Sequence, residues 1–426
     1  MPSDVIIAGA GMAGFQVGAS LRELGYAGRV VIVGDEPYLP YQRPPLSKAY
    51  LLGTSEADRL VMRPDHFYAD KKLEVLIGRR VNILDRANHC VTLDDGTVFE
   101  YGHCVLAVGA RNRPLPVPGA ELRGVHYLRT LAEARDLRAA LATAKRAVVI
   151  GAGFIGLEFA AAAAKLGVAV TVIEVADRPM ARALSPPISS IFTREHTSAG
   201  VRFMFNSQLL RIHGEAGAVL AVETTEHLRV PADVVLIGIG VQPNVEAAAA
   251  AGLEVRNGIV VDEFLRTADP DVSAIGDCAA HPNPFADGHS VRLESVQNAT
   301  DHARCVAARL TGKPLPYANV PWFWSDQGNL KLQIAGLTTG CDQVVVRGDA
   351  AGTACSAFCF KLGRLLGVES VSRPADHMIA RRLIGQHIAV TAAQAGDETF
   401  DLKAHLARHA AAPLERGAPL AAEQSR

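Results

Sequence analysis

The sequence predicts an α/β fold with two doubly wound, mostly parallel sheets and a C-terminal α+β domain. A buried strand, a glycine-rich turn and an amphipathic helix follow one another twice, in residues 4–26 and 146–174. The alternating stretch "LKLQIAG" at residues 330–336 predicts a further strand beyond both of these units. A chain of 426 residues is also too long for one ordinary domain, so we expect three.

The composition excludes several classes of protein. Apolar residues make up 49% and the net charge is −1, so nothing global attracts the chain to nucleic acid or to an anionic membrane. No apolar run is long enough to span a bilayer, and the first residues resemble no secretory leader. The seven cysteines are scattered and form no CxxC pair, which indicates reduced thiols and a cytoplasmic protein. No metal-binding spacing of His or Cys is present, and we expect no metal.

The first glycine motif, "GAGMAG", follows the strand at residues 5–8 and opens a helix. In such a Rossmann-like turn, Gly9 permits the tight bend and Gly11 allows the backbone to approach a pyrophosphate. Gly14 lets the helix pack closely on the strand, and Ala13 lies in the same turn. The next strand ends at Asp35, which we expect to hydrogen-bond a ribose.

The second motif, "GAGFIG", repeats this order with Gly151, Gly153 and Gly156 and a following strand that ends at Glu174. Its helix also begins with an apolar residue, Ile155. Glu174 follows at about the 20-residue spacing expected of a ribose-binding acid. Two dinucleotide sites in one chain predict a redox enzyme that passes electrons from one nucleotide to the other.

Three later stretches assign the two sites. Residues 104–114 and 233–244 are apolar strands that end in glycine turns, and they indicate two crossings between a flavin domain and an inserted nicotinamide domain. Residues 267–279 resemble the second FAD fingerprint of two-dinucleotide flavoproteins, in which Asp277 would bind the ribityl chain. The first motif then holds FAD and the second holds the nicotinamide. Glu174 favours NADH because a carboxylate repels a 2′-phosphate, although Arg178 and Arg182 lie close enough to leave NADPH open.

Four stretches together resemble the NADH-dependent ferredoxin reductases of bacterial oxygenase systems, the putidaredoxin-reductase-like family. They are "LPYQRPPLSKAYL", "GDCA", "RLESVQNATDHARCVAARLTG" and "PWFWSDQGNLKLQIAGL". The resemblance extends to about residue 406. It implies electron transfer from NADH through FAD to a 2Fe–2S ferredoxin, which supplies a haem-thiolate monooxygenase of the cytochrome P-450 type or a Rieske dioxygenase.

The segment after the FAD acid, residues 35–60, contains no cysteine, whereas disulfide reductases of this fold carry their redox pair there. It contains Arg43, Pro44, Pro45 and Lys48 instead. Prolines fix φ and stiffen the turn, so we expect a cation to be held over the flavin. The resemblance pairs Lys48 with Glu158 and makes these two the candidate catalytic residues.

The resemblance and the glycine turns supply further candidate binding residues. They are Val81, Ala107, Gly109, Arg129, Val296 and Trp322 for FAD, and Gly238 and Gly240, with Ile155 and Arg182, for NADH.

The predicted organisation is an FAD domain of residues 1–110 and 243–320, an NADH domain of residues 111–242 and a C-terminal domain of residues 321–406. The Ala/Pro/Arg-rich residues 407–426 are predicted to be a disordered tail. We expect a monomer or weak dimer. The alternatives are an electron donor to rubredoxin or nitrite reductase, an NADH oxidase or peroxide reductase, and an apoptosis-factor-like flavoprotein that binds other macromolecules. The NADH oxidase or peroxide reductase usually needs the missing cysteine, and the apoptosis-factor-like protein usually brings a targeting sequence and a basic surface.

Overall fold

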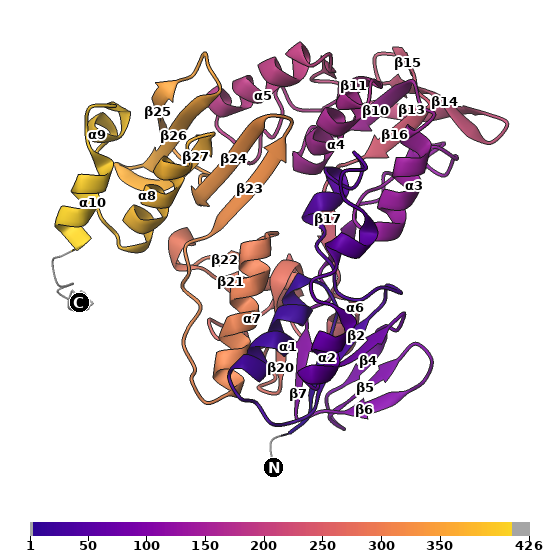
Figure 1. The fold of residues 1–426 in the computed structure, drawn as a ribbon, viewed down its shortest axis with the longest axis vertical. Helices are drawn as coiled ribbons and strands as arrows, with labels where there is room; N and C mark the ends of the chain where they lie inside the picture. Colours follow the sequence, from indigo (N-terminus) through magenta and orange to yellow (C-terminus); the bar gives the residue numbers. More distant parts are fainter. Residues whose placement is uncertain (1–2, 411–426) are drawn as a thin grey trace, which may run out of the picture.

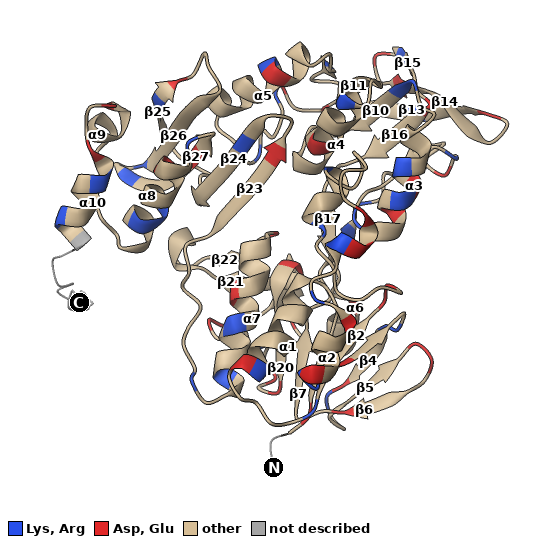
Figure 2. Ribbon diagram, viewed as in Figure 1, with Lys and Arg blue, Asp and Glu red and all other residues tan. Residues whose placement is uncertain are grey.

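The computed structural model describes residues 3–410, which form three packed units (Figure 1). The first unit combines the N-terminal residues with the segment that includes α7, so parts far apart in the sequence lie together. The second unit is inserted between them, and the third follows at the C-terminal end. Acidic and basic residues are spread over all three units (Figure 2), as the net charge of −1 leads one to expect.

The first unit is built on a parallel sheet in the order β20-β7-β1-β2-β3. Its central strands are fully buried, because helices cover a doubly wound sheet on both faces. Helices α1 and α7 pack against each other. The bounds are Val5–Ala8 (β1), Met12–Glu23 (α1), Val30–Gly34 (β2), Asp65–Asp70 (α2), Glu74–Ile77 (β3), His103–Leu106 (β7), Val272–Ala274 (β20) and Val296–Leu310 (α7).

Smaller elements surround this sheet. Strands β4 (Val81–Asp85), β5 (Cys90–Leu93) and β6 (Val98–Glu100) form an antiparallel sheet. A second small sheet contains β18 (Val255–Arg256), β19 (Gly258–Val260), β21 (Ala279–Pro282) and β22 (Ser290–Val291). The 3₁₀ turns η1 (Pro44–Ser47) and η2 (Ala57–Leu60) follow β2, and η3 (Gly276–Cys278) and η4 (Pro284–Ala286) follow β20.

The second unit repeats the design with a parallel sheet in the order β12-β11-β10-β16-β9. An antiparallel sheet of β13, β14 and β15 packs beside it. The bounds are Val125–His126 (β9), Leu131–Leu141 (α3), Arg146–Ile150 (β10), Phe154–Lys165 (α4), Ala169–Ile173 (β11), Pro186–Ser198 (α5), Arg202–Met204 (β12), Leu209–Glu215 (β13), Ala218–Thr224 (β14), Arg229–Pro231 (β15) and Val234–Ile237 (β16).

Two neighbouring strands connect the first and second units. Strand β8 (Ala110–Asn112) leaves the first unit, and β17 (Val241–Pro243) returns to it. They pair antiparallel, with Asn112 opposite Val241. Helix α6 (Glu246–Ala250) then leads back into the first unit. The chain therefore crosses between the units twice at one place, next to the glycine turns.

The third unit is an antiparallel sheet in the order β23-β24-β27-β26-β25. Residues of β24, β26 and β27 share a hydrophobic core with α4 and α5 of the second unit, while helices pack on this sheet to form a separate core. The bounds are Trp322–Gln327 (β23), Leu330–Gly336 (β24), Gln343–Asp349 (β25), Ala354–Lys361 (β26), Arg364–Val371 (β27), Pro374–Gly385 (α8), Ala392–Gly396 (α9) and Leu402–Ala410 (α10).

The predicted fold class is confirmed: two doubly wound α/β units and an α+β unit are present. One boundary differs, because α10 continues through Ala410 and residues 407–410 are helical rather than part of a tail. The remainder of the predicted tail, residues 411–426, lies outside the described residues. Among residues 3–410, no helix has the length and apolar character needed to cross a bilayer.

Candidate active site

One large cavity lies where the three units meet. Its volume is about 1760 Å³, compared with about 300–1,000 Å³ for a pocket that holds a single drug-sized ligand. Both glycine turns, the Pro-rich turn and the first residues of β23 line it. The cavity is therefore large enough for two extended ligands whose reactive ends meet in the middle.

The first glycine turn has the geometry that the sequence predicts. Gly9 has a φ of +116°, and a Cβ on it would lie 2.2 Å from the carbonyl oxygen of Ala107. A Cβ on Gly14 would lie 1.8 Å from the carbonyl oxygen of Gly9, so the start of α1 packs directly on the turn. A Cβ on Gly11, in contrast, would meet nothing within 4 Å. The turn thus closes on itself at Gly9 and Gly14 and faces open space at Gly11.

The second turn repeats this arrangement. Gly151 has a φ of +98°, and a Cβ on it would lie 2.6 Å from the carbonyl oxygen of Gly238. A Cβ on Gly156 would lie 2.3 Å from the carbonyl oxygen of Gly151. Gly153 again faces open space, with a single atom 3.9 Å from its would-be Cβ. Gly240 lines the same part of the cavity at a φ of +99°.

The helices that follow these turns begin without a side-chain cap. Gly11 caps α1 and Gly153 caps α4, and neither has a side chain to accept the first amide hydrogens. Helices α3 and α7, in contrast, are capped by the hydroxyls of Thr130 and Ser295. Free amides at a helix N-terminus bind phosphate. The free amides at the N-termini of α1 and α4 therefore fit the pyrophosphates of two dinucleotides.

The two strand-end acids differ in their surroundings. Asp35 lines the cavity, and its side chain is 57% exposed and pairs with Arg80 across 3.3 Å. Glu174 accepts backbone hydrogen bonds from Ala152 (2.7 Å) and Ala176 (2.9 Å). Glu174 thus fastens the second glycine turn and also lines the cavity.

The Pro-rich segment forms a 3₁₀ turn over Pro44–Ser47 and ends at Lys48, so the prolines set the approach of the lysine. The Nζ of Lys48 lies 2.7 Å from Oε2 of Glu158, which α4 contributes. The Ser47 hydroxyl donates to the same oxygen, and the Ser325 hydroxyl of β23 donates to Oε1 across 2.7 Å. Glu158 is only 5% exposed. A carboxylate and its cation are therefore fixed between the two glycine turns by residues from all three units.

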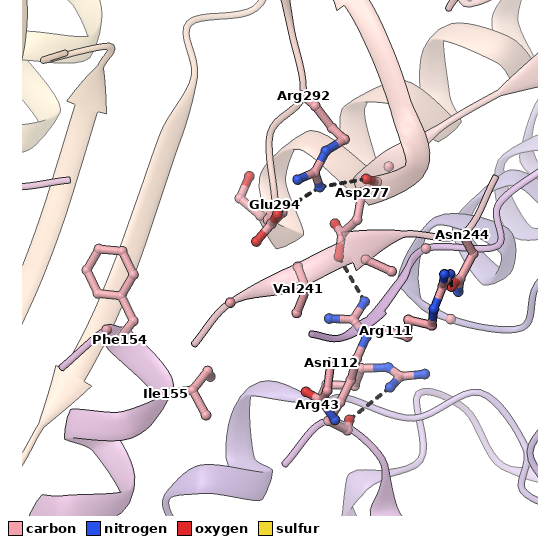
Figure 3. Close-up of a pocket in the computed structure, with 18 of the residues that line it drawn as sticks. Arg43, Arg111, Asn112, Phe154, Ile155, Val241, Asn244, Asp277, Arg292 and Glu294 are labelled. Carbon is pink, nitrogen blue, oxygen red and sulfur yellow. Dashed lines mark hydrogen bonds and ion pairs between the residues drawn. The ribbon is translucent and has the colours of Figure 1, made fainter. Parts of the chain in front are cut away.

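Asp277, at the end of the third motif, also lies in the cavity wall (Figure 3). Its carboxylate pairs with Arg129 across 3.0 Å, and its backbone carbonyl accepts from Arg292 across 3.0 Å. Figure 3 shows Asp277 and Arg292 on one wall, with Arg43 on another. Arg43 is itself paired with Glu36 across 2.7 Å.

Trp322 reaches the cavity from the first residue of β23. Its backbone amide donates to Oε1 of Gln297 across 3.1 Å, near the start of α7. The Trp324 indole lies 5.5 Å from its ring, and the Arg381 guanidinium lies 4.8 Å above it. The tryptophan therefore lies between the cavity and a cation of α8.

No cysteine is among the residues that line the cavity. The nearest in sequence to a lining residue, Cys278, is fully buried, and burial raises the pKa of its thiol to about 11. All seven cysteines are free. Within residues 3–410, no cluster of three or more His, Cys, Asp or Glu side chains could hold a metal ion.

The structure brings the predicted site residues together, apart from Gly14 and Gly156, which lie behind the turns and act through packing. Sequence reasoning missed Ser47 and Ser325, although both stand inside stretches that carried the family resemblance. The predicted residues that line the cavity are Gly9, Gly11, Ala13, Asp35, Arg43, Pro44, Lys48, Val81, Ala107, Gly109, Arg129, Asp277, Val296 and Trp322 on the predicted FAD side, and Gly151, Gly153, Ile155, Glu158, Glu174, Arg182, Gly238 and Gly240 on the predicted NADH side.

Comparisons with known proteins agree with this geometry. Residues 3–303 match the pyridine nucleotide-disulphide oxidoreductase family, and residues 322–406 match the reductase C-terminal family. Rhodocoxin reductase of Rhodococcus erythropolis is 53% identical over 406 residues, which are 95% of each chain. The crystal structure of the ferredoxin reductase for the CYP199A2 system from Rhodopseudomonas palustris is 52% identical, with a TM-score of 0.92 over 94% of this chain and 99% of that one. The putidaredoxin reductase chain of a covalent complex with putidaredoxin is 39% identical, with a TM-score of 0.93 over 96% of this chain and 99% of that one.

These similarities extend over both dinucleotide units and the C-terminal unit, and they agree with the two uncapped helices and the size of the cavity. The protein is an oxidoreductase that uses FAD and NAD(H). The chain belongs to the pyridine nucleotide-disulphide oxidoreductase family, with a C-terminal domain of the reductase type.

Proposed function

We propose that the protein is an NADH:ferredoxin reductase that delivers electrons to a 2Fe–2S ferredoxin of a bacterial oxygenase system. The observation that carries this proposal is a cavity that joins two glycine turns without any cysteine in its wall. Electrons that arrive from NADH then have no thiol pair to reduce and must leave through the flavin. The similar ferredoxin reductases described above support the same role.

The chain's own residues hold and orient the two nucleotides. The first turn, with Asp35, Arg129, Val81 and Asp277, would bind FAD, and the second turn, with Glu174, would bind NADH. When bound, FAD accepts a hydride from NADH and releases the two electrons singly. Lys48 supplies a positive charge that favours the anionic reduced flavin, and Glu158 fixes the ammonium group in place across 2.7 Å.

NADH is the proposed donor because the Glu174 carboxylate would repel the additional 2′-phosphate that NADPH carries on its adenosine ribose. Arg178 is engaged with the carbonyl of Ala181 (3.1 Å) and the carboxylate of Asp177 (3.1 Å). Arg182 is exposed and lines the cavity without an ion-pair partner among residues 3–410, so it is the side chain that would let NADPH bind. We also propose the cytoplasm as the location, because all seven cysteines are free.

The oxygenase behind the ferredoxin would be of the haem-thiolate (P-450) or Rieske type. A rubredoxin or nitrite-reductase electron donor is the second candidate, since it would share the cavity and differ only in its acceptor. An apoptosis-factor-like role is less well supported, because basic and acidic residues are interspersed along the ribbon of all three units (Figure 2) and the net charge is −1.

The experiment is a steady-state assay of the holoenzyme with NADH and, in turn, a purified 2Fe–2S ferredoxin, a rubredoxin and oxygen alone. We expect fast reduction of the ferredoxin, with slow oxygen consumption. Faster reduction of rubredoxin would favour the second candidate. Fast oxygen or peroxide consumption without a carrier protein would contradict both.

A further inference from the structure

A continuous chain of buried polar side chains leads away from the Lys48–Glu158 pair into the third unit. Strand β23 contributes Ser325 and Gln327, which are two residues apart and point to the same face of the strand. Ser325 donates to Glu158 across 2.7 Å, and Gln327 donates to Ser325 across 3.2 Å. The far end is His196 of α5, whose Nε2 lies 2.9 Å from Oε1 of Gln327.

Every member of this chain is removed from solvent. Ser325 is 0% exposed, Gln327 2% and His196 4%. A buried polar group that loses its partner costs free energy, so the directions of these hydrogen bonds are mutually fixed. These hydrogen-bonded side chains therefore form a rigid buried network and not a set of surface contacts.

The directions can be assigned from the donors. Burial lowers the pKa of His196, so the ring is neutral and its Nε2–H donates to Oε1 of Gln327. The Gln327 amide nitrogen then faces Ser325 and the sulfur of Met180, both of which can accept. Because the Ser325 oxygen accepts from Gln327, its one proton is free to go to Glu158.

The two carboxylate oxygens of Glu158 are held separately. Ser47 and Lys48 donate to Oε2, and Ser325 donates to Oε1. No other donor to Oε1 is present among residues 3–410. A glutamate side chain has three rotatable bonds, so loss of the Ser325 hydroxyl would free one side of the carboxylate that anchors Lys48.

We propose that Ser325, oriented by Gln327, is a positioning residue for hydride transfer that sets the placement of Glu158 and Lys48 from the C-terminal unit. The same strand begins with Trp322, which lies in the cavity wall next to α8. Strand β23 therefore connects the Lys48–Glu158 pair with this part of the cavity wall. The third unit is thus a part of the flavin site and not an appendage to it.

The inference rests on hydride transfer from NADH to the flavin, but not on the identity of the acceptor. The experiment therefore omits ferredoxin and follows flavin reduction by NADH in the stopped flow. For Ser325→Ala we expect about a tenfold slower limiting rate, which corresponds to about 1.4 kcal/mol of barrier. The apparent dissociation constant of NADH should change less than twofold, because Glu174 and the second glycine turn are intact.

A second readout does not depend on turnover. The hydroxyl of Ser325 offsets part of the negative charge on Glu158, so its loss should move the flavin midpoint potential to a more negative value. Ser325→Thr keeps a hydroxyl and should restore both the rate and the potential. In a Lys48→Met background, Ser325→Ala should add little, because the two residues act through the same carboxylate.

The matched control is Ser356→Ala. Ser356 lies in the same sheet, is 0% exposed and donates to a buried carboxylate, Asp376, across 2.9 Å. It does not line the cavity. The Ser356→Ala variant should lower the melting temperature as much as Ser325→Ala does, but it should leave the rate of flavin reduction and the midpoint potential at the wild-type values.

Three results would overturn the proposal. They are a wild-type rate and potential for Ser325→Ala, an equal loss in Ser356→Ala, and full additivity of Ser325→Ala with Lys48→Met. Should Ser325→Ala fail to fold, the same measurements on Gln327→Leu decide the question. This variant removes the group that orients Ser325 and should slow flavin reduction in the same direction.

Discussion

The backbone amide of Ala152 donates a hydrogen bond to the Glu174 carboxylate across 2.7 Å, which joins the end of β11 to the second glycine turn. The residue that we propose to bind the ribose of NADH is therefore also a part of the turn that would bind its phosphates. If Glu174 binds the ribose as proposed, nucleotide selectivity and turn geometry are coupled at this one carboxylate.

Glu174→Ala should reduce the preference for NADH over NADPH in kcat/KM. The wild type should prefer NADH, and each tenfold of preference corresponds to about 1.4 kcal/mol. Because the amide of Ala152 also loses its acceptor, KM should rise for both nucleotides, and more for NADH. Glu215→Ala, which removes an exposed acid at the end of β13 in the same unit, should leave the ratio unchanged. Equal use of both nucleotides by the wild type would be incompatible with this role of Glu174.

Lys48→Ala should retain FAD yet slow its reduction by NADH and shift its midpoint potential to a more negative value. The variant removes a cation and leaves Glu158, 5% exposed, as an unpaired negative charge beside the cavity. Stopped-flow reduction and redox titration measure the two effects. Lys165→Ala, at the exposed end of α4, is the control. An unchanged rate and potential would show that Lys48 has no role in flavin reduction.

Thiol-alkylating reagents at pH 7 should leave turnover with ferredoxin unchanged. No cysteine lines the cavity. Burial raises the pKa of Cys104 to about 12 and that of Cys278 to about 11, so these two buried thiols carry almost no thiolate. The same holds for a variant with all seven cysteines changed to serine, apart from a loss of stability. Inactivation that NADH prevents would point to a thiol relay and contradict the proposed electron path.

Arg304→Glu should raise KM for ferredoxin while ferricyanide reduction by NADH stays near the wild-type rate. Arg304 lies on α7, its side chain is 63% exposed, and its ion-pair partner among residues 3–410 is Asp301 at 3.4 Å. An acidic ferredoxin would be attracted to such a cation, and the effect should weaken with salt because the Debye length falls to about 3 Å at 1 M. Arg202→Glu, on β12 of the second unit, is the control.

If both activities of Arg304→Glu fall together, or neither changes, Arg304 is not in the docking surface. Arg292 does not contribute to that surface. Its side chain is 9% exposed and pairs with Glu294 across 2.7 Å.

The melting temperature should fall as the pH is lowered from 7 to 5. Burial, together with the nearby charge of Arg309, depresses the pKa of His103 to about 3, and burial depresses the pKa of His281 to about 4. The unfolded state binds these protons near pH 6.5 whereas the folded state does not, so stability is present above about pH 6.5 and declines below it. Each such histidine contributes up to about 1.4 kcal/mol per pH unit. His281→Asn should flatten the profile, and a flat wild-type profile would contradict this account.

Local geometry explains why so much of the fold was predictable. A positive φ at Gly9 and Gly151 and the close approach at Gly14 and Gly156 admit only glycine, so the motif reports the backbone directly. The pairing of Lys48 with Glu158, 110 residues apart, came from the family resemblance and not from spacing. Nothing local indicated the contact of Ser325 with Glu158, because a serine in a strand does not reveal which distant carboxylate it meets.

The paired strands β8 and β17 have a consequence for the exchange of cofactor modules between related chains. Because Asn112 and Val241 are opposite each other in the ladder, both splice points for a transplanted nucleotide module lie side by side. The cut itself would therefore disturb little of the remaining scaffold. The transplant must nevertheless keep Glu158, His196 and Ser185, which hydrogen-bond to Ser325, Gln327 and Glu369 of the third unit. These contacts with the third unit, and not the splice points, therefore decide whether a donor module is compatible.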